Sequence, residues 1–228
     1  HNQRLSPQML ILRRIINDGL LGKIFRIRRA ECHFKRRNDW QVLRKYNGGL
    51  LANWGVHIVD QTLCLAGAPP KSVWSRMRRE FNPGDCEDDI RVMVECTNDV
   101  ALDLEISYVN AAAGPDWTVL GNRGSAWIEN DHCTIQYIDG EITPLEAVDA
   151  HLAPAQSYEA AQDSLHWERR ILPLNAFGRH EGFYDNMYRV LRQGATPTVS
   201  AQSALTTYRT LDMIREKAWG STEAPSLC

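Results

Sequence analysis

Three polar side chains interrupt a mostly apolar run of the sequence, and their types and spacing suit acid–base chemistry. Asn53, His57 and Asp60 lie within residues 50–66. Spacings of four and three residues place them on one stripe of an α-helix. A buried imidazole, amide or carboxylate costs free energy unless it has a partner. The stripe therefore faces a polar pocket or has partners hidden inside the fold, and the alignment of three groups favours a pocket.

His57 is the candidate for proton transfer. The pKa of a histidine lies close enough to neutral pH for modest changes of environment to shift its charge, which suits a general acid or base in alcohol–ketone interconversion. Asn53, one turn earlier, is suited to orient the imidazole or to bind a substrate hydroxyl. The residues alone supply no hydride acceptor, so they indicate only a pocket for a polyol or carbonyl compound. A hydrogen-bonded core histidine is the alternative interpretation.

Metal and phosphate chemistry have weaker support. Carboxylates outside the stripe would complete a ligand set for zinc or manganese, but His57 has no second histidine four residues away, and we predict no metal site. The segment Gly121-Asn122-Arg123-Gly124 lacks the third glycine of a dinucleotide-binding loop and is predicted to be a turn. Gly48-Gly49 opens the helix, where it permits either anion binding or close packing. The carboxylates considered as ligands are Glu87, Asp88 and Asp89.

The composition is that of an ordinary globular protein and excludes several classes. The net charge of the 228 residues is −2, so nothing in the total indicates a nucleic-acid or membrane partner. The six cysteines form no Cys-x-x-Cys pair, which fits reduced thiols in the cytoplasm. The sequence begins at His1 without an initiator methionine, and we expect a fragment or a processed chain.

The periodicity predicts a single α+β domain over residues 1–228, built on a large, predominantly antiparallel β-sheet with helices on one face. Consecutive strands joined by tight turns indicate a meander and not βαβ units. Residues 147–167 are predicted to be a surface loop. The predicted helices span residues 7–18, 50–66, 182–193 and 201–217, and the predicted strands span 22–35, 71–80, 89–97, 101–109, 117–120, 125–129, 133–138, a short one after Asp139-Gly140, and 168–174.

The second face of this sheet is expected to be buried as well. Apolar residues stand at both parities of several strands, and the four helices can cover one face only. An uncovered apolar face would form a large exposed patch, which monomers rarely tolerate. We therefore expect a homodimer or homotetramer formed through the open face. Apolar residues at one parity include Trp74 and Met77, and those at the other parity, or breaking the alternation, include Val73, Ile90, Met93 and Trp127.

The segment from Gly48 to Gln61, Gly-Gly-Leu-Leu-Ala-Asn-Trp-Gly-Val-His-Ile-Val-Asp-Gln, closely resembles the signature helix of the Gfo/Idh/MocA oxidoreductases. Supporting similarities are Gly19-Leu-Leu-Gly22-Lys-Ile, Gly121-Asn-Arg-Gly124-Ser and Gly194-Ala-Thr-Pro197-Thr-Val-Ser200-Ala. The family combines an N-terminal Rossmann domain with a C-terminal sheet domain that binds substrate and forms oligomers. The resemblance implies that this chain is the second domain, with the Rossmann domain missing upstream of residue 1.

The resemblance also implies roles for individual residues. His57 matches the catalytic histidine, and Asn53 stands beside it where many members carry Asp; an amide cannot act as a base. Asp60 matches a residue that contacts substrate hydroxyls. The remaining implied site residues are Arg36, Asn38 and Trp40 for substrate and Arg4 for cofactor, with NAD or NADP bound mainly by the absent domain.

These implications lead to one expected function and two alternatives. We expect the substrate-binding and oligomerisation domain of an NAD(P)-dependent oxidoreductase that acts on a sugar, a polyol or a related hydroxy or keto compound. The fragment alone is expected to be inactive. The alternatives are a non-catalytic binding or scaffold protein that retains the sheet, and a metal-dependent isomerase or hydrolase.

Overall fold

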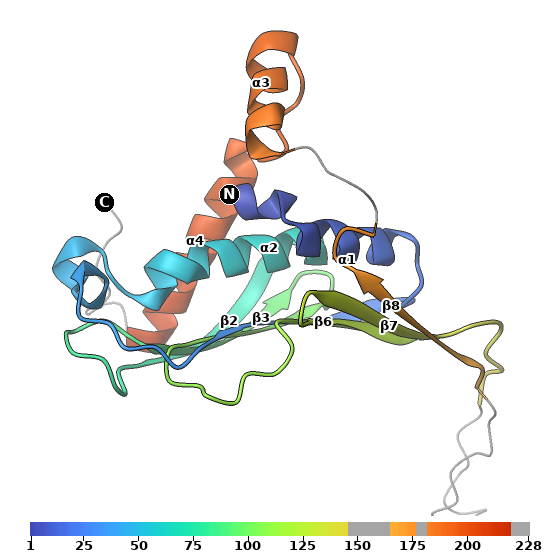
Figure 1. Ribbon diagram of the computed structural model, residues 1–228, viewed down its shortest axis with the longest axis horizontal. Coiled ribbons are helices and arrows are strands. Elements are labelled where there is room, and N and C mark those ends of the chain that lie inside the picture. Colours follow the sequence, from blue (N-terminus) through green and yellow to red (C-terminus); the bar gives the residue numbers. More distant parts are fainter. Residues whose placement is uncertain (146–164, 177–181, 220–228) are drawn as a thin grey trace, which may run out of the picture.

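A computed structural model describes residues 1–145, 165–176 and 182–219 and shows helices packed on one face of a twisted sheet (Figure 1). The helical segments are η1 (Asn2–Leu5), α1 (Pro7–Asn17), η2 (Trp40–Val42), η3 (Arg44–Tyr46), η4 (Leu51–Gly55), α2 (Val56–Ala66), α3 (Phe183–Gln193) and α4 (Ala201–Trp219). The strands are β1 (Ile24–Cys32), β2 (Pro70–Arg78), β3 (Asp89–Cys96), β4 (Ala101–Ser107), β5 (Trp117–Gly121), β6 (Gly124–Glu129), β7 (His132–Ile138) and β8 (Trp167–Pro173).

The eight described strands form one sheet in the order β2-β3-β4-β1-β5-β6-β7-β8. All neighbouring pairs are antiparallel except β1 and β4, which are parallel. The predicted antiparallel character is therefore confirmed, but the simple meander is wrong, because β1 lies between β4 and β5. The predicted short strand after Asp139-Gly140 is also absent from residues 141–145, and most of the predicted loop at 147–167 lies outside the described residues.

Local sequence signals account for most element boundaries. The hydroxyl of Ser6 caps α1 by accepting from the Met9 amide, and Pro7 follows at the first helical position. Gly67 and Gly194 end α2 and α3 in the left-handed conformation, with φ of 70° and 66°. The β6–β7 turn places both Asn130 and Asp131 at positive φ, as a two-residue hairpin with matching twist requires.

The core lies between the sheet and the helices. Alternate residues of the strands point toward α1, α2 and α4, and these residues are buried. Val73, Ile90 and Ile128 belong to this set, whereas Trp74 and Met93 are paired neighbours on the opposite face and are half exposed. The mixed parity predicted from the sequence is thus resolved into a continuous core on one face and scattered apolar groups on the other.

A buried ion pair fastens the helices to one another. The Arg4 guanidinium of η1 donates two hydrogen bonds to the Asp60 carboxylate of α2, at 2.7 and 2.5 Å, and its third nitrogen donates to Ser203 of α4 at 2.9 Å. The hydroxyl of Thr207, also in α4, donates to the same carboxylate at 2.9 Å. Arg4 and Asp60 are 6% and 1% exposed, so three segments distant in sequence meet at one desolvated charge pair.

Replacing Asp60 with Asn should destabilise the fold severely, because it leaves the buried Arg4 charge without its counter-ion. A broken buried pair typically costs about 3–5 kcal/mol, whereas an exposed pair contributes about 1 kcal/mol or less. The matched control is Asp18→Asn, which breaks the exposed pair with Arg14. Urea denaturation followed by circular dichroism measures both; equal losses would contradict a structural role for Asp60.

The core assignment has its own paired test. Leu102 of β4 is 0% exposed and Leu191 of α3 is 73% exposed. Leu102→Ala should cost about 2–5 kcal/mol through lost burial and the cavity that remains. Leu191→Ala removes the same atoms from the surface and should change the free energy of unfolding by no more than about 0.5 kcal/mol. A large loss at Leu191 would show that α3 packs elsewhere.

Candidate functional site

The site is built around the helix that follows Gly48-Gly49. This helix begins with a π turn, η4, and continues as α2, so that His57 is the second residue of the regular helix. The sequence predicts one α-helix throughout, and the structure corrects this in the first turn. π turns are rare and often mark functional positions.

The glycine pair leaves room for a carboxyl group from another part of the chain. The carboxylate of Glu87, two residues before the start of β3, accepts a hydrogen bond from the Leu51 amide at 3.0 Å. A Cβ at Gly49 would lie 2.5 Å from the Glu87 carboxylate, and Gly49 has φ of +107°. A Cβ at Gly48 would lie 2.5 Å from the Gln41 carbonyl oxygen. Of the two interpretations left open by the sequence, close packing is therefore confirmed, and the carboxyl group at this helix end is a side chain of the protein.

The three residues of the polar stripe differ in their hydrogen-bond partners. The Asn53 amide donates to Gln41 at 2.7 Å and so turns to the η2 segment instead of to the imidazole. Asp60 is enclosed by Arg4 and Thr207, and both of its oxygens accept hydrogen bonds within the protein. These hydrogen bonds, with that from Arg4 to Ser203, indicate a structural role for Asp60 and Arg4. The two residues also line a cavity of about 390 Å³ with Ser203 and Thr207, so their predicted contacts with substrate and cofactor stay predictions.

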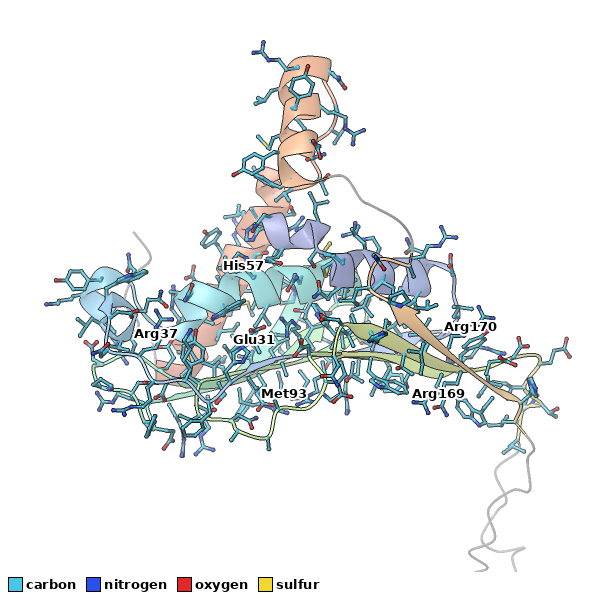
Figure 2. All side chains as sticks on the ribbon, viewed as in Figure 1. Glu31, Arg37, His57, Met93, Arg169 and Arg170 are labelled. Atoms are coloured by element: carbon cyan, nitrogen blue, oxygen red, sulfur yellow. The ribbon has the colours of Figure 1, made fainter. Side chains whose placement is uncertain are left out.

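His57 is the member of the stripe that lacks such a partner. Its ring is partly buried, and Nδ1 has no hydrogen-bond partner among the described residues. Burial lowers the pKa of His57 below its ordinary value, mainly by disfavouring the charged imidazolium. At neutral pH the ring is therefore uncharged and able to accept a proton. Figure 2 marks His57 in the helix layer, above the sheet.

Aromatic side chains connect His57 with the end of the sheet. The Trp54 ring meets the His57 ring edge-on at 6.4 Å between centroids, and its indole nitrogen donates to the Tyr108 hydroxyl at 3.0 Å. The ammonium group of Lys35 lies 5.8 Å from the centre of the Tyr108 ring. Neither Trp54 nor Tyr108 is among the site residues predicted from the sequence. Trp54 lies three residues before His57, so helical spacing could have indicated it. Tyr108 directly follows β4, and the pairing of the strands brings it to this position.

The predicted substrate residues after β1 are only partly brought together. Arg36 and Asn38 line a cavity of about 310 Å³ with Arg37, Phe81, Asn82 and Pro83. The guanidinium of Arg36 lies 5.9 Å from the centre of the Phe81 ring. Trp40 is 53% exposed and is not among the lining residues. A smaller space lined by Arg37, Asn82, Gly49, Glu87 and Tyr108 adjoins this cavity at the beginning of the helix.

The residues considered for metal binding do not converge on His57. Asp88 accepts from the backbone amides of residues 80, 81 and 82 and so shapes the β2–β3 loop. Within the described ranges, one group brings three metal-ligand atoms within 4.8 Å of one another: Asp139, His166 and Glu168. That group lies where β7 meets β8.

No helix in the described part of the chain has the length and apolar character needed to cross a membrane.

Comparison with solved structures shows the same architecture in longer proteins. An NAD-binding protein from Listeria innocua matches with a TM-score of 0.74 and 22% identity, over 95% of this chain and 63% of that protein. An oxidoreductase from Bacillus cereus matches with a TM-score of 0.69 and 18% identity, over 98% of this chain and 63% of that protein. At these identities the likeness shows the fold.

Sequence comparison identifies the family. Two uncharacterized oxidoreductases of Schizosaccharomyces pombe are each 26% identical to this chain, over 137 and 133 residues. Each match covers 54% of this chain and 36% of the relative, so the matched region spans about a third of the curated relatives. The model of the GFO/IDH/MocA C-terminal domain matches residues 9–127, just over half of the chain. With its sheet, its helix layer and this match, the chain belongs to the GFO/IDH/MocA family of oxidoreductases, of which it contains the C-terminal domain.

Proposed function

We propose that this chain is the substrate-binding domain of an NAD(P)-dependent oxidoreductase acting on a sugar, a polyol or a related hydroxy or keto compound, with His57 as its general acid and base. One observation carries the proposal: Nδ1 of His57, alone among the side-chain nitrogens and oxygens of the polar stripe, is a buried atom left without a partner in the described structure. Family membership and the similarity to the NAD-binding protein from Listeria innocua support the reaction class.

The state of His57 fits the proposed direction of proton transfer. A neutral imidazole takes the proton of a substrate hydroxyl as the alcohol becomes a carbonyl, and it returns the proton in the reverse reaction. The nicotinamide cofactor, when bound, supplies the hydride chemistry. Asn53 does not act as a second base, because it is an amide and is tied to Gln41.

The described residues offer no cradle for the phosphates of a dinucleotide. Gly121 and Gly124 are paired residues of the β5–β6 hairpin and do not open a helix. The helix end at Gly48-Gly49 is occupied by Glu87. We therefore propose that another domain of the complete polypeptide binds the cofactor. The relatives extend beyond the region that matches this chain, which supports a separate cofactor-binding domain.

The proposed substrate region is the cavity that Arg36 and Asn38 share. Its volume of about 310 Å³ is at the lower end of the range for small-molecule sites, and its guanidinium and amide groups suit a hydroxylated ligand. Arg37 is less available, because its guanidinium is paired with Asp39. Trp40 and Tyr46 add exposed aromatic surface nearby in the chain, at 53% and 55% exposure.

We further propose that two copies of the chain associate through the open sheet face. Figure 2 shows Met93 and Arg169 on the side of the sheet away from the helices. Trp74 and Met93 pair across β2 and β3, with exposures of 54% and 41%. Across the sheet Ile171 is 59% exposed, and the Arg169 guanidinium lies 5.7 Å from the Trp127 ring centre. Between these apolar groups Arg91 pairs with Asp103 and Glu105, and Arg28 also pairs with Glu105, so that two positive and two negative charges offset one another.

The catalytic proposal predicts that His57→Ala lowers turnover of the complete enzyme by about 10²–10⁴-fold while the fold survives. The control is His33→Ala, because His33 is exposed and pairs with Glu31. Steady-state kinetics and circular dichroism together measure both effects. Normal turnover in His57→Ala would favour a core histidine in a non-catalytic binding protein.

The same proposal sets the pH dependence. The folded-state pKa of His57 is lowered, so the active neutral form persists below the ordinary histidine pKa of about 6.5. Oxidation of the alcohol should therefore fall as pH decreases through the folded-state pKa, on the acid side of 6.5. The stability that the neutral ring contributes is lost over the same fall in pH.

The interface proposal predicts that the wild-type chain sediments as a species larger than 25.9 kDa at micromolar concentration. Trp74→Glu with Met93→Glu should shift it to a monomer, because two charges would be buried without partners. Leu191→Glu, an exposed change on α3, is the control. A wild-type monomer would refute the proposal.

A further inference from the structure

Glu87 is a buried carboxylate that neither the core nor the proposed proton transfer accounts for. It is 7% exposed, and one of its oxygens accepts from the Leu51 amide at 3.0 Å. Its other oxygen has no hydrogen-bond partner among the described residues and lies beside a cavity of about 10 Å³. Such a group costs free energy, so its place at the beginning of the His57 helix requires a reason.

The surroundings of Glu87 are shaped to hold a carboxylate. Gly49 leaves the space that a Cβ would fill, and its positive φ allows the backbone to pass at that distance. Burial raises the pKa of Glu87, while Arg44 and Arg215 oppose that rise. Arg215 is itself 7% exposed and belongs to α4. Three separate parts of the chain therefore contribute to this one position.

The contact lies at the N-terminal end of the π turn. Leu51 is the first residue of η4, which ends at Gly55 immediately before α2. An α-helix advances about 100° per residue. Changing this turn from π to α geometry would alter the register by about one residue and rotate His57 relative to Gly48-Gly49 by a similar angle. The interactions that hold the turn thus determine where the imidazole points.

We propose that Glu87 is the positioning residue of His57: by holding the Leu51 amide beside Gly49, its carboxylate maintains the π turn and sets the direction of the imidazole. A simple helix cap would stabilise the helix end without controlling the ring. The effect on the ring is a property of this chain and can be measured without substrate. Its consequence for turnover rests on the proposed function.

The test follows the side chain of His57 by NMR in the chain as it stands, with His57→Gln used to assign its signals. Glu87→Gln keeps an oxygen for the Leu51 amide and should leave the chemical shifts and the pKa of His57 close to wild type. Glu87→Ala removes that oxygen and should shift the ring signals and raise the pKa of His57 by about half a unit or more as the ring becomes better hydrated. Glu80→Ala, in the same β2–β3 segment but exposed and paired with Arg78, should do neither.

Two further variants test the same contact if Glu87→Ala does not fold. Glu87→Asp keeps the charge but is one methylene shorter, and Gly49→Ala places a methyl where the carboxylate lies; both should move His57 as Glu87→Ala does. If these variants fold and leave the His57 signals and pKa unchanged, Glu87 is only a cap and the proposal is wrong. In the complete enzyme, Glu87→Ala should lower kcat more than it changes KM. If His57→Ala retains full turnover, the proposed function fails while the NMR result on Glu87 still stands.

Discussion

The bidentate ion pair between Arg4 and Asp60 determines how the helix layer is assembled. The two residues are 56 positions apart, and the hydroxyls of Ser203 and Thr207 bring in a helix near the other end of the described chain. Removing both charges from water is costly, and the pair persists because nearly every donor and acceptor is satisfied. This arrangement allows little variation in the angle at which α2 crosses the sheet, so the position of His57 follows from it.

The same pair explains why the side chains of the polar stripe do not bond to one another. Asp60 is paired with Arg4, Asn53 is bonded to Gln41, and the buried Nδ1 of His57 has no partner among the described residues. A pocket and hidden partners were alternatives from the sequence. Asp60 combines the two, because it is bonded to Arg4 and Thr207 and also lines a cavity of about 390 Å³. The division is physically reasonable, because a proton-transfer group needs a free nitrogen while the residues around it need fixed positions.

Much of the fold could be predicted from local signals. Gly67 and Gly194 mark helix ends, Ser6 and Pro7 mark a helix start, and alternation locates most strands. Local signals could not place β1 between β4 and β5, because parallel pairing depends on a crossover of more than 60 residues and not on either strand's own pattern. Nor could they predict the contacts of Glu87 and Tyr108 with the His57 helix, because these contacts join residues 36 and 54 positions apart in the sequence. The π turn was hidden for a different reason: its residues are as apolar as those of an ordinary α-helix.

The most direct test of the account is a crystal structure of the complete polypeptide bound to its nicotinamide cofactor and a sugar or polyol. The account predicts that a ring nitrogen of His57 lies within hydrogen-bond distance, about 2.6–3.2 Å, of the hydroxyl that is oxidised. It also predicts that Arg4 remains bonded to Asp60. A substrate bound away from α2, or an imidazole covered by apolar residues of another domain, would contradict the central claim that His57 transfers the proton.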